Sequence, residues 1–418
     1  MIQSRTAGVQ SRYVPVATVV GLATALAFLL LVARPAATHL THGFSAYDTA
    51  ARLLLEGQSP IRFYDDDWFR QQTIRLGFAG ADDIYNLNPP TTALLLWPLA
   101  GLDPISAKVA WTALNLSFLA LALFGLVHLT RGGLPAAVVG VVIVAVFQPV
   151  REEIGLGQAY ALLLALEVAL LWADQTRRDP VVGLVLGTML SFKTAGIALP
   201  GLLLAQRRWR ALDWTALTGA AIVAITLPWL GVEAWGRYLS LLSRFGGQPE
   251  IAVTAYQDLP GVWLHLFRFD QIWNPAPLVV LPWLALILLA ATAFGLVGYT
   301  TRVTWATEPP SAQARTLAFA AWASLSLVLS PVSEDYHYTL LLVPIAIVLA
   351  DWRDSPRSWR TATILALAVF LVGAPLPYKA PALTAGAWAL LAYPKLYGAL
   401  LIWWLSVSAL RRDKRRRA

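Results

Sequence analysis

Residues 14–32 read VPVATVVGLATALAFLLLV, and this uncharged apolar run decides the fold class of the chain. A helix of about 20 apolar residues crosses the roughly 30 Å hydrocarbon core of a membrane. The run follows a short basic leader that contains Arg5 and Arg12, and it is too long for the core of a cleaved signal peptide. We therefore interpret it as an uncleaved first membrane span whose N-terminal side lies in the cytoplasm.

Apolar runs of similar length recur along the whole chain. Of its 418 residues 57% are hydrophobic and 13% are charged, which exceeds what one water-soluble core requires. Because lipid offers no partner to open backbone groups, the sequence predicts an all-α, polytopic transmembrane helical bundle of about twelve spans in one domain, residues 1–418. Beyond the first span, full spans are expected near residues 106–128, 134–150, 159–173, 213–230, 277–299, 312–330, 337–350, 360–376 and 393–410.

Two shorter features interrupt this series. A short re-entrant or interfacial helix is expected near residues 91–100. Within residues 181–205, two short spans that meet at residues 191–193 would keep the flanking basic clusters on the cytoplasmic side. Broken helices are tolerated where they line a protein cavity, so this break indicates a site. One tilted helix with a snorkelling Lys193 is the alternative.

The charge pattern reports topology. The net charge is +8, but the cations cluster at the ends of apolar runs, so we expect no nucleic-acid partner. The basic tail at residues 411–417 places the C-terminus in the cytoplasm, where it can contact anionic membrane lipid. Two polar segments then lie outside: a first outer loop at residues 38–88 and a second outer segment at residues 232–275, both carrying short surface helices. The chain has no cysteine, which excludes disulfides, thiolate nucleophiles and Cys-ligated metals.

Candidate catalytic groups collect on this outer side. Six aspartates in the first outer loop could take a proton from an acceptor hydroxyl, although a solvated face with helix-capping aspartates is the simpler reading of any single one. Arg151, Lys193 and His337 come to the same side, where cations are unusual, and a phosphate ester would explain them. Pairing with a neighbouring carboxylate, such as that of Glu152 or Glu153 with Arg151, is the alternative.

Several short motifs follow one another in a fixed order. They are residues 43–47 (GFSAY), residues 50–57 (AARLLLEG), residues 88–90 (NPP), Gly157-Gln158, Lys193 in the helix break, residues 257–261 (QDLPG) and residues 330–337 (SPVSEDYH). In order and spacing this set resembles the polyprenyl-phosphate-dependent glycosyltransferases of the GT-C fold, specifically glycosyltransferase family 87. The resemblance covers most of the chain.

The resemblance implies an inverting glycosyltransferase in the plasma membrane of a bacterium. Such an enzyme moves a sugar, typically mannose or a related hexose or pentose, from a polyprenyl-phosphate donor to a lipid or glycan hydroxyl on the non-cytoplasmic face, and it serves the cell envelope. An aspartate deprotonates the acceptor while cations stabilise the leaving phosphate. Neither a metal nor another cofactor is required. Nothing in the sequence indicates an oligomeric state.

The resemblance also assigns residues to roles. The family usually carries an aspartate before its Phe-x-x-Tyr element, but this position is Gly43 here. Asp48 is therefore the nearest substitute as the base, followed by Asp66 and Asp83, with Asp335 as a more remote option. The donor phosphate is assigned to Lys193, His337 and Arg151. Further substrate contacts are assigned to Tyr47, Tyr85, Asn88, Gln158, Gln257 and Asp335.

Two other functions fit the same composition. A transporter or flippase of lipid-linked sugars would place its polar residues along a path at the bilayer midplane. A non-catalytic protein that binds lipid-linked sugar is the second alternative, and Gly43 at the expected position of the base favours it.

Overall fold

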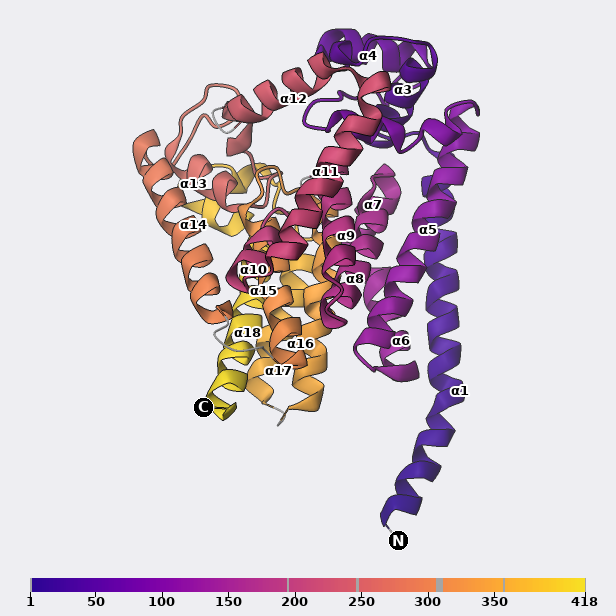
Figure 1. The fold of residues 1–418 in the computed structure, drawn as a ribbon, viewed down its shortest axis with the longest axis vertical. Coiled ribbons are helices and arrows are strands. Elements are labelled where there is room, and N and C mark those ends of the chain that lie inside the picture. The colour runs from indigo at the N-terminus through magenta and orange to yellow at the C-terminus, as the bar shows by residue number, and fades with distance from the viewer. Residues whose placement is uncertain (1, 194, 246–247, 306–310, 356–357, 418) are drawn as a thin grey trace.

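The computed structural model describes residues 2–193, 195–245, 248–305, 311–355 and 358–417, and in these ranges the chain is helical without a named β-strand (Figure 1). The longer helices are α1 (Ile2–Phe28), α5 (Pro104–Leu129), α6 (Gly133–Val146), α8 (Tyr160–Gln175), α9 (Asp179–Phe192), α11 (Trp209–Leu230), α12 (Val232–Phe245), α14 (Pro282–Thr304), α15 (Ala312–Leu329), α16 (Leu342–Asp354), α17 (Trp359–Gly373) and α18 (Pro394–Arg417). The shorter helices are η1 (Leu29–Ala33), α2 (Arg34–Thr38), α3 (Phe44–Leu55), η2 (Pro60–Tyr64), α4 (Asp66–Arg75), η3 (Pro90–Leu94), η4 (Trp97–Leu99), α7 (Gln148–Leu156), α10 (Leu199–Ala205), η5 (Pro249–Ala252), α13 (Leu259–Phe267), η6 (Asp335–Leu341), η7 (Pro381–Leu383) and η8 (Gly386–Ala392).

The chain is a multi-pass integral membrane protein. Among the described residues, five helices are long and apolar enough to cross a membrane, and the number rises to seven if the bent pairs α6–α7 and η8–α18 each form one span. The predicted total of twelve crossings stays a prediction. Helix α10 has seven residues, about 10 Å at 1.5 Å per residue, which is far less than a hydrocarbon core.

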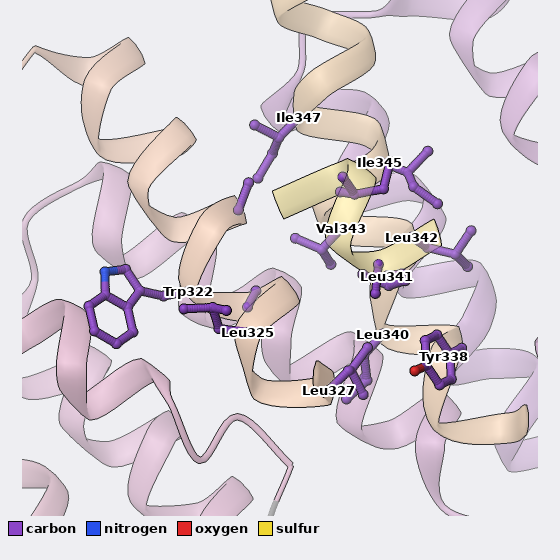
Figure 2. Close-up of a cluster of buried hydrophobic side chains, with 14 of the residues drawn as sticks. Trp322, Leu325, Leu327, Tyr338, Leu340, Leu341, Leu342, Val343, Ile345 and Ile347 are labelled. Atoms are coloured by element: carbon purple, nitrogen blue, oxygen red, sulfur yellow. The ribbon is translucent and has the colours of Figure 1, made fainter. Parts of the chain in front are cut away.

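Helix α15 forms the centre of the bundle. Its apolar window is 72% buried, whereas the corresponding windows of α11 and α14 are 11% buried and face outward. Trp322 and Leu325 of α15 lie in the same buried cluster as Leu341 and Val343 of the η6–α16 segment (Figure 2). Helix α15 is thus surrounded by other helices, and α11 and α14 expose apolar side chains on the outside of the bundle, as expected when lipid covers that surface.

Helices α9 and α11 pack at very short range. A Cβ atom added to Gly183 would lie 2.7 Å from the carbonyl oxygen of Ala211, and one added to Gly187 would lie 2.7 Å from that of Thr215. Small residues at such positions let two backbones approach closely inside a membrane. This contact fixes the position of the end of α9, where the predicted helix break occurs. The break is confirmed, because α9 ends at Phe192 and α10 begins at Leu199.

The segments predicted as outer loops contain short helices. Helices α3, α4 and α12 lie at the end of the bundle opposite both chain termini (Figure 1). They share one core, in which the rings of Phe63, Phe69 and Tyr85 meet and Tyr238 of α12 packs against Tyr64. The membrane side that this end faces stays a prediction.

The helix predicted near residues 91–100 has a different form. Two short 3-10 helices, η3 and η4, stand there in place of one continuous α-helix. Pro98 has no backbone N–H to donate, so it cannot continue an α-helical ladder from the preceding turn.

Candidate active site

Lys193 lies in the helix break after α9, at the centre of a cluster of polar side chains. Its Nζ donates a hydrogen bond to Asn88 Oδ1 over 2.5 Å. Burial lowers the pKa of Lys193 to about 8. Three carboxylates act on this pKa in the opposite direction, those of Glu153, Glu334 and Asp83. The break therefore holds one cation within electrostatic reach of three acids.

The segment that follows Asn88 braces the break. The C-terminal carbonyl groups of a helix have no partner within the helix itself. The Thr91 hydroxyl donates to the carbonyl of Ser191, and the Thr92 hydroxyl donates to that of Phe192 over 2.8 Å. Both threonines are fully buried. The Asn-Pro-Pro-Thr-Thr stretch thus both contacts the Lys193 ammonium group and fixes the backbone that carries it.

Asp83 is bound to the backbone at the start of α3. Its Oδ2 accepts from the Gly43 N–H over 2.6 Å, and its Oδ1 accepts from the Ile84 N–H over 2.8 Å. Burial raises the pKa of Asp83 above its usual range, while these two N–H groups, together with the charges of His42 and Lys193, act in the opposite direction. The carboxyl group is consequently held in one orientation, within electrostatic reach of Lys193.

Gly43 cannot carry a side chain in this arrangement. Its φ is +78°, and a Cβ atom there would lie 2.3 Å from Gln158 Nε2. Residues with a side chain rarely adopt this backbone conformation, and a distance of 2.3 Å between the added Cβ and Gln158 Nε2 is far shorter than van der Waals contact. Residue 43 is the position at which the sequence led us to expect an aspartate. A carboxylate is nevertheless present there, because the Gly43 N–H donates a hydrogen bond to Asp83 Oδ2.

A second wall of the cluster is aromatic. Tyr47 on α3 donates its hydroxyl hydrogen to Gln158 Oε1 over 2.5 Å, and Lys193 Nζ lies 5.2 Å from the centroid of the Tyr47 ring. The ring of His337 lies 4.5 Å from the rings of both Tyr160 and Tyr336, centroid to centroid. Three predicted residues, Tyr47 of the first outer loop, Gln158 before α8 and His337 of η6, thus lie along this aromatic group.

His337 is neutral in this arrangement. Its Nδ1 accepts a hydrogen bond from the backbone N–H of Glu334 over 3.1 Å, so that nitrogen carries no proton. We expected a cation that would attract phosphate. The structure leaves an Nε2–H group, which can donate a hydrogen bond but adds no charge.

Two acidic members of the cluster were missed as site residues by the sequence reasoning. Glu153 is 1% exposed, its Oε1 accepts from the Ala161 N–H over 2.9 Å, and its Oε2 has no hydrogen-bond partner among the described residues. Burial raises the pKa of Glu334, and the charges of Lys379 and Lys193 act in the opposite direction. Both glutamates lie close to the quoted motifs, at Gly157-Gln158 and within residues 330–337, and that proximity was the available signal.

Asp48 and Asp66 have other neighbours. Asp48 is fully buried and forms an ion pair with Arg52 over 2.5 Å, one turn further along α3. Burial raises its pKa, and the Arg52 guanidinium opposes that rise. Asp66 lies in the first turn of α4, where burial also raises its pKa and the charges that oppose the rise are those of Arg70 and Arg237. Of the three aspartates, only Asp83 is among the carboxylates that act electrostatically on Lys193.

Tyr85 and Arg151 also lie apart from the cluster. Tyr85 is fully buried in the core of the α3–α4 region and donates its hydroxyl hydrogen to the Pro89 carbonyl over 2.8 Å. Through this hydrogen bond Tyr85 fixes the backbone of the Asn-Pro-Pro stretch. Arg151 is exposed on α7, two residues before Glu153.

Gln257 and Asp335 are occupied by contacts within the protein. Gln257 is fully buried and donates from Nε2 to the carbonyl groups of Thr254 and Ala392, each over 2.7 Å. Asp335 pairs with Lys395 over 2.5 Å and accepts from the Tyr378 hydroxyl. These contacts fix the start of α18 against η6, which carries His337.

The described part of the chain contains no group of three or more His, Cys, Asp or Glu side chains placed to hold a metal ion. The carboxylates of Asp83 and Glu153, which act electrostatically on Lys193, are instead held by the backbone N–H groups of Gly43 and Ala161.

Comparison with known proteins identifies relatives of this chain. The family described as "Glycosyltransferase family 87" matches residues 86–331, more than half of the chain. A polyprenol-phosphate-mannose-dependent alpha-(1-2)-phosphatidylinositol mannoside mannosyltransferase of Mycobacterium tuberculosis is 28% identical over 286 residues, which is 63% of this chain and 62% of the relative. The protein of the same name from Mycolicibacterium smegmatis is 29% identical over 353 residues, 78% of this chain and 74% of the relative. The match thus spans less than two thirds of the length of the first relative. No solved structure matches this chain.

Proposed function

Because this chain belongs to glycosyltransferase family 87, we propose that it transfers a sugar from a polyprenyl-phosphate donor to a hydroxyl group of a lipid or glycan. The relatives are named for polyprenol-phosphate-mannose and for a phosphatidylinositol mannoside, so mannose and a lipid-linked acceptor are the first candidates. The observation that carries the proposal is the position of two charged groups at helix α3: the Asp83 carboxylate is bound to the Gly43 N–H at its start, and the Lys193 ammonium group lies 5.2 Å from the centroid of the Tyr47 ring, within electrostatic reach of that carboxylate. Such a pair supplies a base and a counter-charge for a leaving phosphate.

Asp83 acts as the base. It takes the proton of the acceptor hydroxyl while the acceptor oxygen attacks the anomeric carbon of the sugar. The bond from that carbon to the phosphate oxygen breaks on the opposite side, and its electron pair stays with the phosphate. The anomeric configuration is inverted. The N–H groups of Gly43 and Ile84 orient the carboxylate and favour its ionised form.

Asp83 is a better base than the other acids at the site. Glu153 is 1% exposed and is tied to the first turn of α8 through the Ala161 N–H. Asp48 is neutralised by Arg52. Asp83 retains partial exposure, so an acceptor hydroxyl can reach it.

Lys193 stabilises the leaving phosphate. One of its three N–H bonds is directed to Asn88, which leaves donors for phosphate oxygens. The carboxylates around it favour the charged form against the effect of burial. His337 Nε2–H is a further donor on the same side, and exposed Arg151 on α7 can attract the donor head group.

The same proposal includes the orientation in the membrane. The basic C-terminal part of α18 lies at the end of the bundle opposite α3 and α4, and cations mark the cytoplasmic side. Both termini are then cytoplasmic, and the site opens on the outer face of a bacterial plasma membrane, where the product enters the cell envelope.

A transfer assay tests the function directly. The purified protein in lipid nanodiscs is incubated with radiolabelled polyprenyl-phosphate-mannose and a phosphatidylinositol mannoside, and the lipid products are separated. Labelled acceptor supports the proposal. Binding of polyprenyl phosphate without transfer to any of a panel of lipid and glycan acceptors would indicate a non-catalytic sugar-lipid binder. Movement of intact donor between leaflets of a vesicle, without transfer, would indicate a flippase.

A further inference from the structure

An apolar crevice lies between helices α5 and α6 on one side and α16 on the other. Its volume is about 300 Å³, at the lower end of the range for pockets that bind small molecules. Leu123 and Val139 belong to one wall and Ile345 and Leu349 to the other, and nearly all of the lining is hydrocarbon. The polar cluster around Lys193 contributes none of the lining residues.

Small residues keep the crevice open. Ala136 and Gly140 stand one turn apart on α6, and Ala346 and Ala350 stand one turn apart on α16. Larger side chains at Ala136, Ala346 and Ala350 would enter the space that these residues line, whereas Gly140 lets α6 approach α5, because an added Cβ there would lie 2.5 Å from Leu123 Cδ1. In a membrane, a gap of this kind is filled by whichever chains of lipid or protein fit it.

One end of the crevice is charged. Arg353 and Trp352, at the C-terminal end of α16, belong to the lining, and Arg353 Nη2 donates to the Thr130 carbonyl at the end of α5 over 2.9 Å. Arg353 also pairs with Asp354, which lies within electrostatic reach of Arg131. The positive charges of Arg353 and Arg131 outnumber the negative charge of Asp354, so this end of the crevice has a net positive charge. Tryptophan and arginine together are typical of the level of lipid head groups.

We propose that this crevice binds an anionic diacyl phospholipid, with one acyl chain between α6 and α16 and its phosphate at Arg353. The shape of the site matches the ligand, since an apolar slot ends at a positive charge. The position of the charge excludes the sugar donor as the occupant. Helix α16 follows η6, which carries His337, and runs away from it to Arg353, so a lipid phosphate at Arg353 lies at the other end of the bundle from Lys193. The lipid belongs to the leaflet opposite the active site.

Photo-crosslinking tests the proposal. The full chain is placed in phosphatidylcholine nanodiscs that contain a small fraction of phosphatidylglycerol with a diazirine in one acyl chain, and the labelled peptides are mapped after irradiation. Labelling is expected on α6 and α16. Ala346→Trp fills the slot and is expected to lower that labelling about tenfold, and Arg353→Gln, which removes a charge-assisted hydrogen bond to phosphate, is expected to lower it by a similar factor.

Leu121→Trp is the matched control. Leu121 is 60% exposed on α5 and does not line the crevice, so labelling is expected to stay at the level of the wild type. If Ala346→Trp fails to fold, the comparison of Arg353→Gln with Arg353→Lys, which keeps the charge, decides the question. The retention of labelling by Arg353→Gln would overturn the proposal.

Three further outcomes would also overturn it. The first is equal labelling of the crevice and of the Leu121 face. The second is preferential labelling of α6 and α16 by a diazirine analogue of polyprenyl phosphate that phosphatidylglycerol does not displace. The third is capture of a second polypeptide by a photoreactive residue at Ala350. None of these results depends on sugar transfer, which is measured separately.

Discussion

The Gly43 N–H donates a hydrogen bond to Asp83 Oδ2 over 2.6 Å, and the two residues are 40 positions apart in the chain. A Cβ atom at position 43 would lie 2.3 Å from Gln158 Nε2. Gly43 and Asp83 therefore depend on each other. The absence of a side chain at position 43 leaves room for Gln158 and leaves the Gly43 N–H free to bind the carboxylate of Asp83.

Gly43→Ala should damage both stability and activity. The backbone conformation of Gly43, with φ +78° and ψ −62°, costs about 1–3 kcal/mol for a residue with a side chain, and the clash with Gln158 adds to it. Gly57→Ala is the matched control, because Gly57 has a φ of +70° with no atom within 4 Å of an added Cβ. Thermal unfolding in detergent should show a larger decrease in Tm for Gly43→Ala. Equal decreases would contradict the close packing described at position 43.

Replacing both Thr91 and Thr92 by valine should loosen the helix break that carries Lys193. The two hydroxyl groups satisfy carbonyls at the end of α9, and leaving buried carbonyls without partners costs about 1–3 kcal/mol each. We expect a higher KM for the donor, measured with a saturating acceptor. Thr73→Val is the control, since the Thr73 hydroxyl bonds within α4 to the Arg70 carbonyl. An unchanged KM in the double variant would show that the break holds its position without the two threonines.

The rate of transfer should depend on pH in a bell-shaped manner. Asp83 must be ionised to accept a proton, so the rate falls as the pH decreases through its pKa, which burial places above that of an ordinary aspartate. Lys193 must be protonated, so the rate falls as the pH rises through about 8. Lys193→Arg keeps its charge over the whole range and should abolish the alkaline decrease. An alkaline decrease that survives in Lys193→Arg would assign that limb to another group.

Lys395→Met should strongly destabilise the protein. It leaves the buried Asp335 carboxylate without its cation, which costs about 3–5 kcal/mol when one partner of a buried pair is removed. Lys379→Met is the control, because Lys379 is exposed and lies above the same Tyr378 ring at 5.6 Å. Adding Asp335→Leu to Lys395→Met should restore part of the loss in a denaturation experiment. Without such recovery, the main role of Asp335 would lie outside the ion pair.

The sequence was sufficient for those features that depend on local pattern. Apolar runs identified the helical membrane fold, and the basic clusters on both sides of residues 181–205 indicated the break at residues 191–193. The partner of Lys193 could not be derived in the same way. Asn88 lies 105 residues earlier, and only the packing of η3 against the end of α9 brings the two together.

The ranking of the acids shows the same limit. Asp48 was the first choice as base because it stands next to Tyr47, but one helical turn places Arg52 beside it. Asp83 was ranked behind Asp48, and it reaches Gly43 through a loop whose course the sequence does not encode in any regular pattern. Pairing of Arg151 with Glu152 or Glu153 was the alternative, whereas residues two positions apart on α7 point to different sides of the helix, so Arg151 is exposed and Glu153 is buried.

The most direct test of the central claim is a comparison of turnover and donor binding for Asp83→Asn, with Asp82→Asn as the control. Asp82 lies beside Asp83, and its carboxylate faces Arg70 at 3.6 Å. We predict that Asp83→Asn binds polyprenyl phosphate with a Kd close to that of the wild type and loses about 10²- to 10⁴-fold in kcat, the usual contribution of a general base. Asp82→Asn should retain both. Turnover of Asp83→Asn at the wild-type rate, with loss of turnover in Asp48→Asn or Glu153→Gln instead, would contradict the assignment of the base to Asp83.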